Sequence, residues 1–252
     1  MVKQITSVNN SYIKELLTLK DKKERILKKS FIVEGYHLVE EAYNHKLLKA
    51  VLSTDEEVLN NFNIEESYKV NDIIINKLSS TKNPQNIIGI VDIKDNADYS
   101  KDILKENFRA IILDDVNDPG NLGTIIRTAA ALGYDMIISS LQTVDYYNEK
   151  VIRATQGAIF KIALCKDNLE NIIPILKKNN IRIYGTSLKS AVSVSSIDPS
   201  KKFAVVLGNE ANGVSEEVLK LCDQNIIIPL DNNVESLNVG VAGAILMWEL
   251  KK

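Results

Sequence analysis

The sequence predicts an α/β protein with two parts, a small N-terminal α/β domain over residues 1–95 and a parallel-sheet domain over residues 106–252. A chain of 252 residues is long enough for two ordinary domains, each with its own core. From residue 109 onward, continuous apolar runs alternate with helical patterns, as in a parallel sheet that is buried on both faces. The polar, charged stretch 94–108 lies between the two parts and marks the boundary. Periodicity alone therefore predicts a doubly wound sheet in the second part.

The composition excludes several classes of function. Cys165 and Cys222 lack CxxC spacing, so a disulfide framework or a zinc site is not expected. His37 and His45 have no ligand spacing, so neither a metal site nor a histidine-based triad is expected. No signal peptide or membrane-length apolar run is present, which predicts a cytoplasmic protein without a membrane partner. With a net charge of −2, any contact with nucleic acid needs a local positive surface.

The N-terminal part has the pattern of a compact α/β unit. A short strand at 31–33 leads into an amphipathic helix with Leu38, Val39, Ala42 and Tyr43 on one side. Brief β-branched strands follow, with a helix expected over 72–78 and a turn near residues 83–84.

One segment of this part is strongly basic. Residues 20–29, KDKKERILKK, hold six basic and two acidic residues. The run is either a solvated helix face or a patch that contacts phosphates, since basic side chains gain affinity only when they lie near the nucleic acid backbone. Both interpretations stay open.

In the second part, the segment 114–133 joins a strand to a helix. Asp118 is expected to cap the helix, Pro119 suits its first position, and Gly133 suits its end. Arg127 lies one turn after Gly123 on the same face. Free amides at a helix start beside an arginine are suited to a phosphate.

Two later loops also follow strands. Residues 205–214 run from a strand into GNEANG, which lacks the Lys and Ser or Thr of a phosphate-binding P-loop. Residues 228–238 follow the last strand, and Ser236 is expected to cap a final helix whose residues 239–248 carry no charge and no amide side chain. Because ligands of such sheets bind at the carboxyl ends of strands, we expect these loops to form the functional site.

The three loops together carry the motifs of a known family. Asn121, Gly123 and Arg127 match NxGxxxR, the segment 208–210 with Gly213 matches a strand followed by GxE, and residues 236–239 read SLNV. In this order they resemble the SpoU/TrmH family of RNA ribose methyltransferases within the SPOUT class. Residues 31–93 resemble the substrate-binding domain of that family, and RATQGAIF at 153–160 is similar to a further family stretch.

The resemblance implies a parallel sheet with a C-terminal trefoil knot and S-adenosylmethionine as cofactor, held largely by main-chain groups. The positions that carry over as cofactor-binding are Thr186, Gly208, Asn209, Ile228, Pro229 and Leu237. It also implies a homodimer through the final helix, because one sheet covers only one face of so apolar a helix. Burial of this helix entirely within one chain is the alternative.

The resemblance further implies a catalytic set. Its members are Asn121, Arg127, Glu210, Ser236 and Asn238. A guanidinium stays protonated in proteins and is a poor general base. Arg127 is therefore expected to hold a phosphate and stabilise the emerging alkoxide, while a phosphate or a water takes the proton and the other four residues orient the reacting groups.

The expected reaction is S-adenosylmethionine-dependent methylation of a ribose 2′-hydroxyl in RNA. The N-terminal domain favours large-subunit ribosomal RNA as the substrate. The alternatives are a tRNA ribose methyltransferase, methylation of a base, and a noncatalytic protein that binds RNA or assists ribosome assembly.

Overall fold

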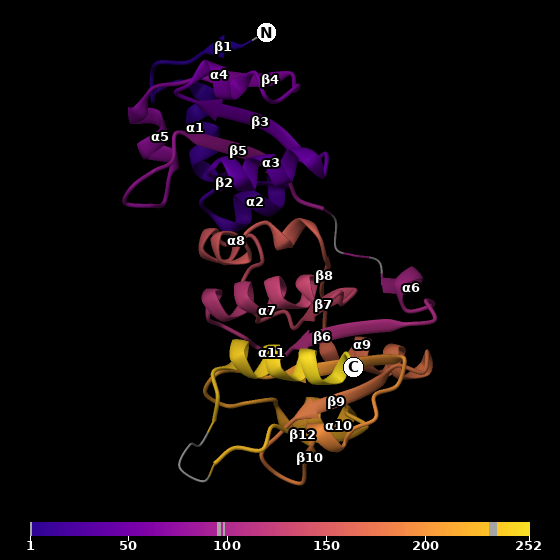
Figure 1. The fold of residues 1–252 in the computed structure, drawn as a ribbon. Coiled ribbons are helices and arrows are strands. Elements are labelled where there is room, and N and C mark those ends of the chain that lie inside the picture. Colours follow the sequence, from indigo (N-terminus) through magenta and orange to yellow (C-terminus); the bar gives the residue numbers. More distant parts are fainter. Residues whose placement is uncertain (1, 95–96, 98, 232–235) are drawn as a thin grey trace. The chain divides into compact units, whose positions relative to one another are not determined.

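The computed structural model describes every residue except 1, 95, 96, 98 and 232–235. It forms two compact units, each of which has its own sheet (Figure 1). The first comprises Met1–Asp95 together with Tyr147–Phe160, and the second comprises Asn96–Tyr146 and Lys161–Lys252. The segment 147–160 interrupts the second part in sequence, yet it packs with the first unit.

The first unit contains a five-stranded mixed sheet in the order β1-β4-β3-β5-β2. Its strands are β1 (Lys3–Gln4), β2 (Ser30–Glu34), β3 (Leu48–Ser53), β4 (Glu66–Lys69) and β5 (Ile87–Asp92). Its helices are α1 (Ser11–Thr18), α2 (Lys22–Lys28), α3 (Tyr36–Asn44), α4 (Glu56–Leu59), α5 (Asp72–Leu78), α8 (Glu149–Thr155) and the 3-10 turn η1 (Ala158–Phe160). The predicted strand at 31–33 and helix at 72–78 are confirmed, and α3 buries Leu38, Val39 and Ala42 as expected.

Aromatic contacts fix the 147–160 segment in this unit. The Phe31 ring of β2 lies 4.8 Å from the Tyr147 ring and 6.4 Å from the Phe160 ring, measured between centroids. His37 of α3 contacts the carbonyl oxygen of Gln156 through its Nε2, at 3.2 Å. These contacts place α8 beside β2.

The second unit is built on a seven-stranded sheet in which every strand pair is parallel, so the predicted parallel sheet is confirmed. The strand order is β10-β12-β9-β11-β6-β7-β8. The strands are β6 (Phe108–Leu113), β7 (Met136–Ser139), β8 (Ala163–Lys166), β9 (Arg182–Thr186), β10 (Val192–Ser193), β11 (Lys202–Leu207) and β12 (Gln224–Ile227). The strands β6, β9 and β11 at its centre consist mainly of fully buried apolar residues.

Helices pack on both faces of this sheet. They are α6 (Tyr99–Asp102), α7 (Pro119–Ala131), α9 (Leu169–Lys178), α10 (Glu216–Leu221) and α11 (Val239–Leu250), with the 3-10 turn η2 (Val194–Ser196). Side chains of α9 and α10 share a core cluster with Ala110 and Ile112, whereas α7 and α11 pack on the side of Leu207. The α7 signals are confirmed, because Asp118 caps the helix, Pro119 is its first residue and Gly133 follows its end at φ +73°.

The stretch predicted as a boundary belongs largely to the second unit. It contains α6, and Ile103 is buried in the core cluster with Phe108. The polar composition of 94–108 gave no sign that Ile103 and Phe108 both belong to the core of the sheet, because their burial depends on tertiary contacts.

The expectation that Ser236 caps the final helix is wrong. The cap of α11 is Asn238, whose Oδ1 accepts hydrogen bonds from the N–H groups of Gly240 at 2.9 Å and Val241 at 3.2 Å. Because α11 begins at Val239, Ser236 lies two residues too early to reach the free amides of the first turn. The helix lies against α7, and the hydroxyl of Tyr134 donates to the carbonyl oxygen of Met247 at 3.0 Å (Figure 1).

Three further expectations concern the chain as a whole. Both cysteines are free thiols, Cys165 fully buried and Cys222 half-buried. No helix in the described part of the chain has the length and apolar character that crossing a membrane requires. The trefoil knot stays a prediction, since residues 232–235 of the connection before α11 lie outside the described residues.

Candidate active site

The candidate site lies at the carboxyl edge of the parallel sheet in the second unit. Strands β12, β9, β11 and β6 are neighbours in that order and all run in the same direction. The loops that follow them therefore open at one edge, which is where open α/β sheets bind ligands. These loops carry most of the residues that the sequence singled out.

Glu210 joins the loop after β11 to the start of α7. Its carboxylate accepts hydrogen bonds from the main-chain N–H groups of Asn117 at 3.1 Å and Asp118 at 3.0 Å. It also accepts one from the side-chain amide of Asn121, at 2.9 Å. Three donors on one carboxylate fix the position of the loop relative to the helix.

These donors also change the acidity of Glu210. Partial burial raises the pKa of this carboxyl group, but the hydrogen bonds from Asn121 and from the main chain at 117 and 118 outweigh it. The net result is a pKa below the ordinary value for glutamate, because the donors stabilise the ionised form.

Asn238 extends this network to the last helix. Its side-chain Nδ2 donates to Oδ1 of Asn121 at 2.8 Å, while its own Oδ1 caps α11. Asn121 therefore contacts Glu210 through its amide nitrogen and Asn238 through its carbonyl oxygen. The structure thus brings together Asn121, Glu210 and Asn238, three of the five predicted catalytic residues.

Gly208 leaves no room for a side chain. A Cβ atom built at this position would lie 2.1 Å from both the carbonyl carbon of Gly213 and the nitrogen of Val214. The loop closes on itself there, because Asn209 and Gly213 exchange two main-chain hydrogen bonds of 2.9 Å. The Asn209 side chain holds the same loop, since it donates to the carbonyl oxygen of Asp115 at 2.8 Å and accepts from Ala211 at 2.9 Å.

The other predicted cofactor positions are apolar or already hydrogen-bonded through their side chains. Ile228 and Leu237 are half-buried, and Pro229 is exposed. The hydroxyl of Thr186 donates to the carbonyl oxygen of Val206 at 2.9 Å. These positions offer main-chain groups and uncharged side chains, which suits a neutral ring system.

Arg127 and Ser236 lie outside the hydrogen-bonded network. Both are exposed, and within the described part of the chain Arg127 has no hydrogen-bond or salt-bridge partner. An exposed guanidinium without such a partner keeps its donors for an anionic ligand. The hydrogen bonds among Asn121, Glu210 and Asn238 therefore do not hold the Arg127 side chain in place.

Two aspartates that the sequence analysis did not single out support the loops. Asp114, at the end of β6, accepts from the N–H group of Ser215 at 2.8 Å and from its hydroxyl at 2.7 Å. Asp115 has φ +58° and accepts from the hydroxyl of Ser140 at 2.6 Å, while its carbonyl oxygen binds Asn209. The sequence signal that could have identified Asp114 and Asp115 was the position of two successive acidic residues directly after an apolar strand.

The fold and the site define a class of protein. A parallel sheet with a fixed polar network at its carboxyl edge and an exposed arginine on the adjoining helix is suited to a protein that binds a ligand at that edge and contacts an anionic partner. Comparison with known proteins gives the particular family. The model of the SpoU rRNA methylase family matches residues 109–248, and that of the MRM3-like substrate-binding domain matches residues 10–89. The chain belongs to the SpoU rRNA methylase family.

Several relatives match along the whole chain. The 23S rRNA (guanosine(2553)-2′-O)-methyltransferase RlmP of Bacillus subtilis is 35% identical over 99% of this chain and 100% of its own length. The AdoMet-bound rRNA methyltransferase of Sinorhizobium meliloti is 31% identical, with a TM-score of 0.90 over 99% of this chain and 97% of that chain. The SpoU methyltransferase AviRb of Streptomyces viridochromogenes, at 21% identity and a TM-score of 0.87 over 96% and 97% of the two chains, shares the fold.

Family membership establishes the chemistry at the level of class. The protein is an RNA methyltransferase that uses S-adenosylmethionine. The sequence-based expectation of this family, its fold class and its cofactor is confirmed.

The lowered pKa of Glu210 leads to a prediction on stability and pH. A group whose pKa is lower in the folded than in the unfolded protein stabilises the fold above the unfolded value, and this contribution is lost as the pH falls through the folded value. Glu210→Gln should therefore reduce the free energy of unfolding at neutral pH, and the difference from wild type should shrink below about pH 4.5. Urea unfolding over a pH series measures it.

Glu217→Gln is the control for this experiment, because Glu217 is exposed and has no described partner. It should change the free energy of unfolding little at any pH. A Glu210→Gln difference that stays constant down to pH 3 would contradict the lowered pKa.

Proposed function

We propose that the protein transfers the methyl group of S-adenosylmethionine to a ribose 2′-hydroxyl of large-subunit ribosomal RNA in the cytoplasm. The observation that carries the proposal is the network of Asn121, Glu210 and Asn238 at the carboxyl edge of the sheet. This network joins residues of the three sequence motifs, and its Asn121 lies on the same helix, α7, as the exposed Arg127.

The choice of substrate rests on the relatives and on the first unit. The Bacillus subtilis relative is named for 2′-O-methylation of a guanosine in 23S rRNA, and it matches this chain over its whole length. The first unit matches a substrate-binding domain model. A tRNA substrate is the second candidate, since a Synechocystis relative that is 29% identical over 100% of this chain is described as a tRNA/rRNA methyltransferase.

The residues at the sheet edge fit the cofactor. Main-chain groups at Gly208, Ile228 and Leu237 would hold its adenosine part, with Thr186, Asn209 and Pro229 shaping the loops around them. The closed loop at Gly208 supports this role, because the close approach of Gly208 to the main chain of Gly213 and Val214 fixes the course of the main chain at this edge of the sheet. S-adenosylmethionine supplies the methyl group.

Arg127 is proposed to bind the RNA phosphate next to the target ribose and to stabilise the negative charge that develops on the 2′-oxygen. It cannot act as a general base at neutral pH, so the phosphate or a water takes the proton. Asn121, Glu210 and Asn238 hold α7 and the loop after β11 in place, and Ser236 is proposed to orient the ribose. Holding both reactants in position can lower the barrier by as much as about 7–11 kcal/mol.

Arg127→Ala should abolish most methyl transfer while the affinity for the cofactor stays near wild type. The reason is that Arg127 lies on an exposed face of α7 and belongs to none of the loops proposed to hold the cofactor. Removing such a charge contact in the transition state lowers the rate by roughly 100- to 1,000-fold. Transfer of a tritiated methyl group to ribosomal RNA measures the rate, and calorimetry measures the affinity.

Arg182→Ala is the matched control. Arg182 is an exposed arginine at the start of β9, so it lies at the opposite edge of the sheet from the candidate site. It should retain both properties. Equal loss of transfer and cofactor affinity in Arg127→Ala would show that the residue has been assigned the wrong role. Digestion of the labelled RNA to nucleosides separates ribose from base methylation, and no label in any RNA would favour the noncatalytic alternative.

We also propose that two copies of the chain associate through α11. Its apolar side chains Val241, Ile245 and Trp248 are 48%, 40% and 61% exposed although the opposite side of the helix is buried. Their spacing of four and three residues puts them on one face. A second copy would remove this face from water, as the family resemblance implies.

Trp248→Glu should convert the dimer to a monomer, since a carboxylate at the centre of an apolar interface loses its hydration without gaining a partner. Sedimentation velocity measures the change. Ile73→Glu, on an exposed position of α5, is the control and should keep the wild-type mass. A wild-type chain that sediments as a monomer at all concentrations would refute the proposal.

A further inference from the structure

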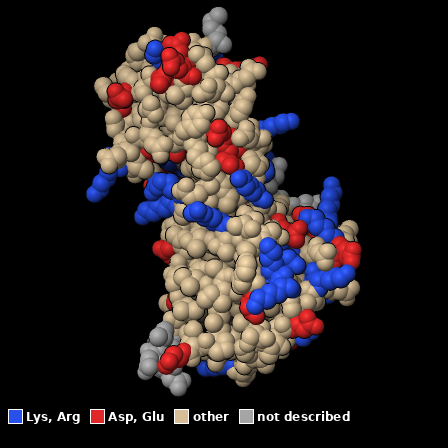
Figure 2. Space-filling model, viewed as in Figure 1, with Lys and Arg blue, Asp and Glu red and all other residues tan. Residues whose placement is uncertain are grey.

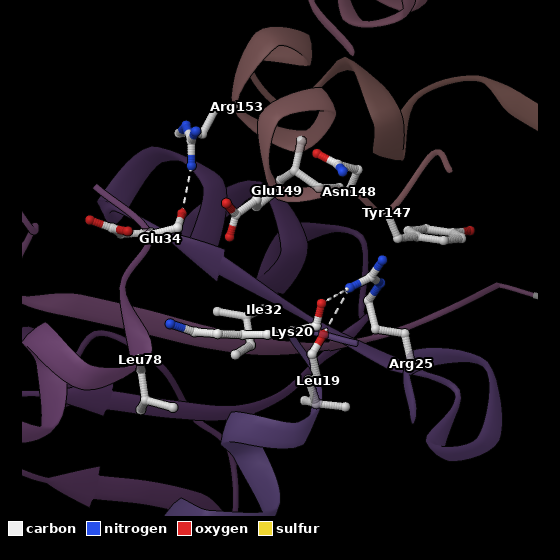
Figure 3. Close-up of a pocket in the computed structure, with 12 residues that line it drawn as sticks. Leu19, Lys20, Arg25, Ile32, Glu34, Leu78, Tyr147, Asn148, Glu149 and Arg153 are labelled. Atoms are coloured by element: carbon white, nitrogen blue, oxygen red, sulfur yellow. Dashed lines mark hydrogen bonds between the residues drawn. The ribbon is translucent and has the colours of Figure 1, made fainter. Parts of the chain in front are cut away.

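The first unit contains a cavity with both polar and apolar lining residues that the proposed methyl transfer does not use. Its volume is about 430 Å³, within the range of sites that hold a small molecule or a single nucleotide. It lies between the segment 19–34 on one side and α8 on the other, with Leu78 at one end (Figure 3), and Ser80 also lines it. All of its lining residues belong to the first unit.

The walls of the cavity are fixed by internal hydrogen bonds. Lys20 donates through Nζ to the carbonyl oxygens of Lys77 at 3.0 Å and Ser79 at 3.1 Å. Arg25 is buried and donates to the carbonyl oxygens of Leu19 and Lys20, both at 2.9 Å. Arg153 of α8 donates to the hydroxyl of Ser80 at 2.6 Å. The cavity is therefore a formed site, lined by three cations.

The two carboxylates of the cavity differ in their contacts. Glu34 accepts hydrogen bonds from Ser79 at 2.7 Å, Thr81 at 2.8 Å and the N–H group of Gln85 at 3.0 Å. Glu149, by contrast, has no hydrogen-bond or salt-bridge partner in the described part of the chain, and it extends from α8 toward the strand that carries Ile32 (Figure 3). Its two oxygens remain acceptors for a ligand.

Asn148 adds a donor beside this carboxylate. Its Oδ1 accepts from the N–H group of Lys150 at 2.9 Å, which directs the oxygen to the helix start. The Nδ2 group has no partner among the described residues. A donor and a carboxylate on adjacent residues can bind the edge of a base that carries both N–H groups and an oxygen.

Basic side chains surround the cavity. Residues 20–29 and 147–156 carry α2 and α8, both of which contact β2, and they contain eight basic and three acidic residues. Figure 2 shows Lys and Arg gathered over the region where Figure 1 labels α2 and α8. Lys22 and Lys23 are exposed and have no described partner, and the apolar Ile26 and Leu27 beside them are 63% and 76% exposed. A face that serves only for hydration does not require those two apolar side chains.

We infer that this face of the first unit is an RNA-binding surface in which the cavity holds one unpaired nucleotide, with guanine as the preferred base. Guanine has two adjacent N–H donors, which match the two oxygens of Glu149, and an oxygen that can accept from Asn148. The basic residues of α2 and α8 contact the phosphates on either side. The inference rests on the proposed action on RNA, and it assigns the basic run at 20–29 to phosphate contact.

The test measures RNA binding by the full chain. Fluorescence anisotropy is recorded with a labelled short oligouridylate and with the same oligomer carrying one central guanosine, each over a series of salt concentrations. The wild type should bind the guanosine oligomer more tightly. Lys22→Ala combined with Lys23→Ala should weaken binding of both oligomers alike and lower the slope of log affinity against log salt by about 1.4.

The control for the lysine pair is Lys14→Ala combined with Lys178→Ala, which removes the same charge from exposed positions of α1 and α9. This variant should keep the wild-type slope. Equal slopes for the two double variants would overturn the assignment of the basic face.

Glu149→Gln tests the cavity. The amide keeps the size of the side chain but replaces one acceptor by a donor, so the preference for the guanosine oligomer should fall by roughly tenfold while binding of the oligouridylate does not decrease. Glu57→Gln, on the exposed start of α4, is the control and should keep the preference. An unchanged preference in Glu149→Gln, or no preference in the wild type, would overturn the assignment of the cavity.

Methyl transfer to ribosomal RNA is assayed with the same proteins, so that the two proposals fail separately. Wild-type transfer with unchanged RNA binding in the variants overturns the inference and leaves the proposed function in place. RNA binding that responds as expected, without any methyl transfer, supports the inference and overturns the proposed function.

Discussion

The carboxylate of Glu210 makes the contacts on which the arrangement of the candidate active site depends. It holds the loop after β11 against the start of α7, and through Asn121 it reaches the cap of α11. These three elements are distant in sequence, and packing of the sheet alone does not fix their loops relative to one another. Because the donors are two main-chain amides and one side-chain amide, the contact is stronger when the carboxylate is ionised than when it is protonated.

The two kinds of ligand are proposed to be held by different parts of the chain. The proposed cofactor contacts come mainly from main-chain groups, and at Gly208 the main chain of Gly213 and Val214 lies too close to admit a side chain. The RNA contacts would come from cations, Arg127 in the second unit and the basic face of α2 and α8 in the first. This division explains how a chain with a net charge of −2 can act on a polyanion, since the positive potential has to be present only locally.

Local signals in the sequence were sufficient for much of the fold. The parallel sheet follows from its apolar strands, and the ends of α7 follow from Asp118, Pro119 and Gly133, each of which acts within one helical turn. Features set by distant contacts were missed or misplaced. Asn238 caps α11 where Ser236 was expected, Ile103 joins a core from within a polar stretch, and α8 packs on β2 across more than a hundred residues of sequence. In the site, the motifs identified Asn121, Glu210 and Asn238, but only the structure shows that one asparagine connects the other two residues.

A double-mutant cycle between Glu210 and Asn238 tests most directly whether these two residues are coupled through Asn121. The two side chains are joined through Asn121. The free energy of unfolding at neutral pH is measured for Glu210→Gln, for Asn238→Ala, for the double variant and for wild type. The account predicts that the double variant loses less stability than the sum of the single variants, by about 0.5–3 kcal/mol. Strictly additive losses would contradict it, because the loop after β11 and the last helix would then be held independently.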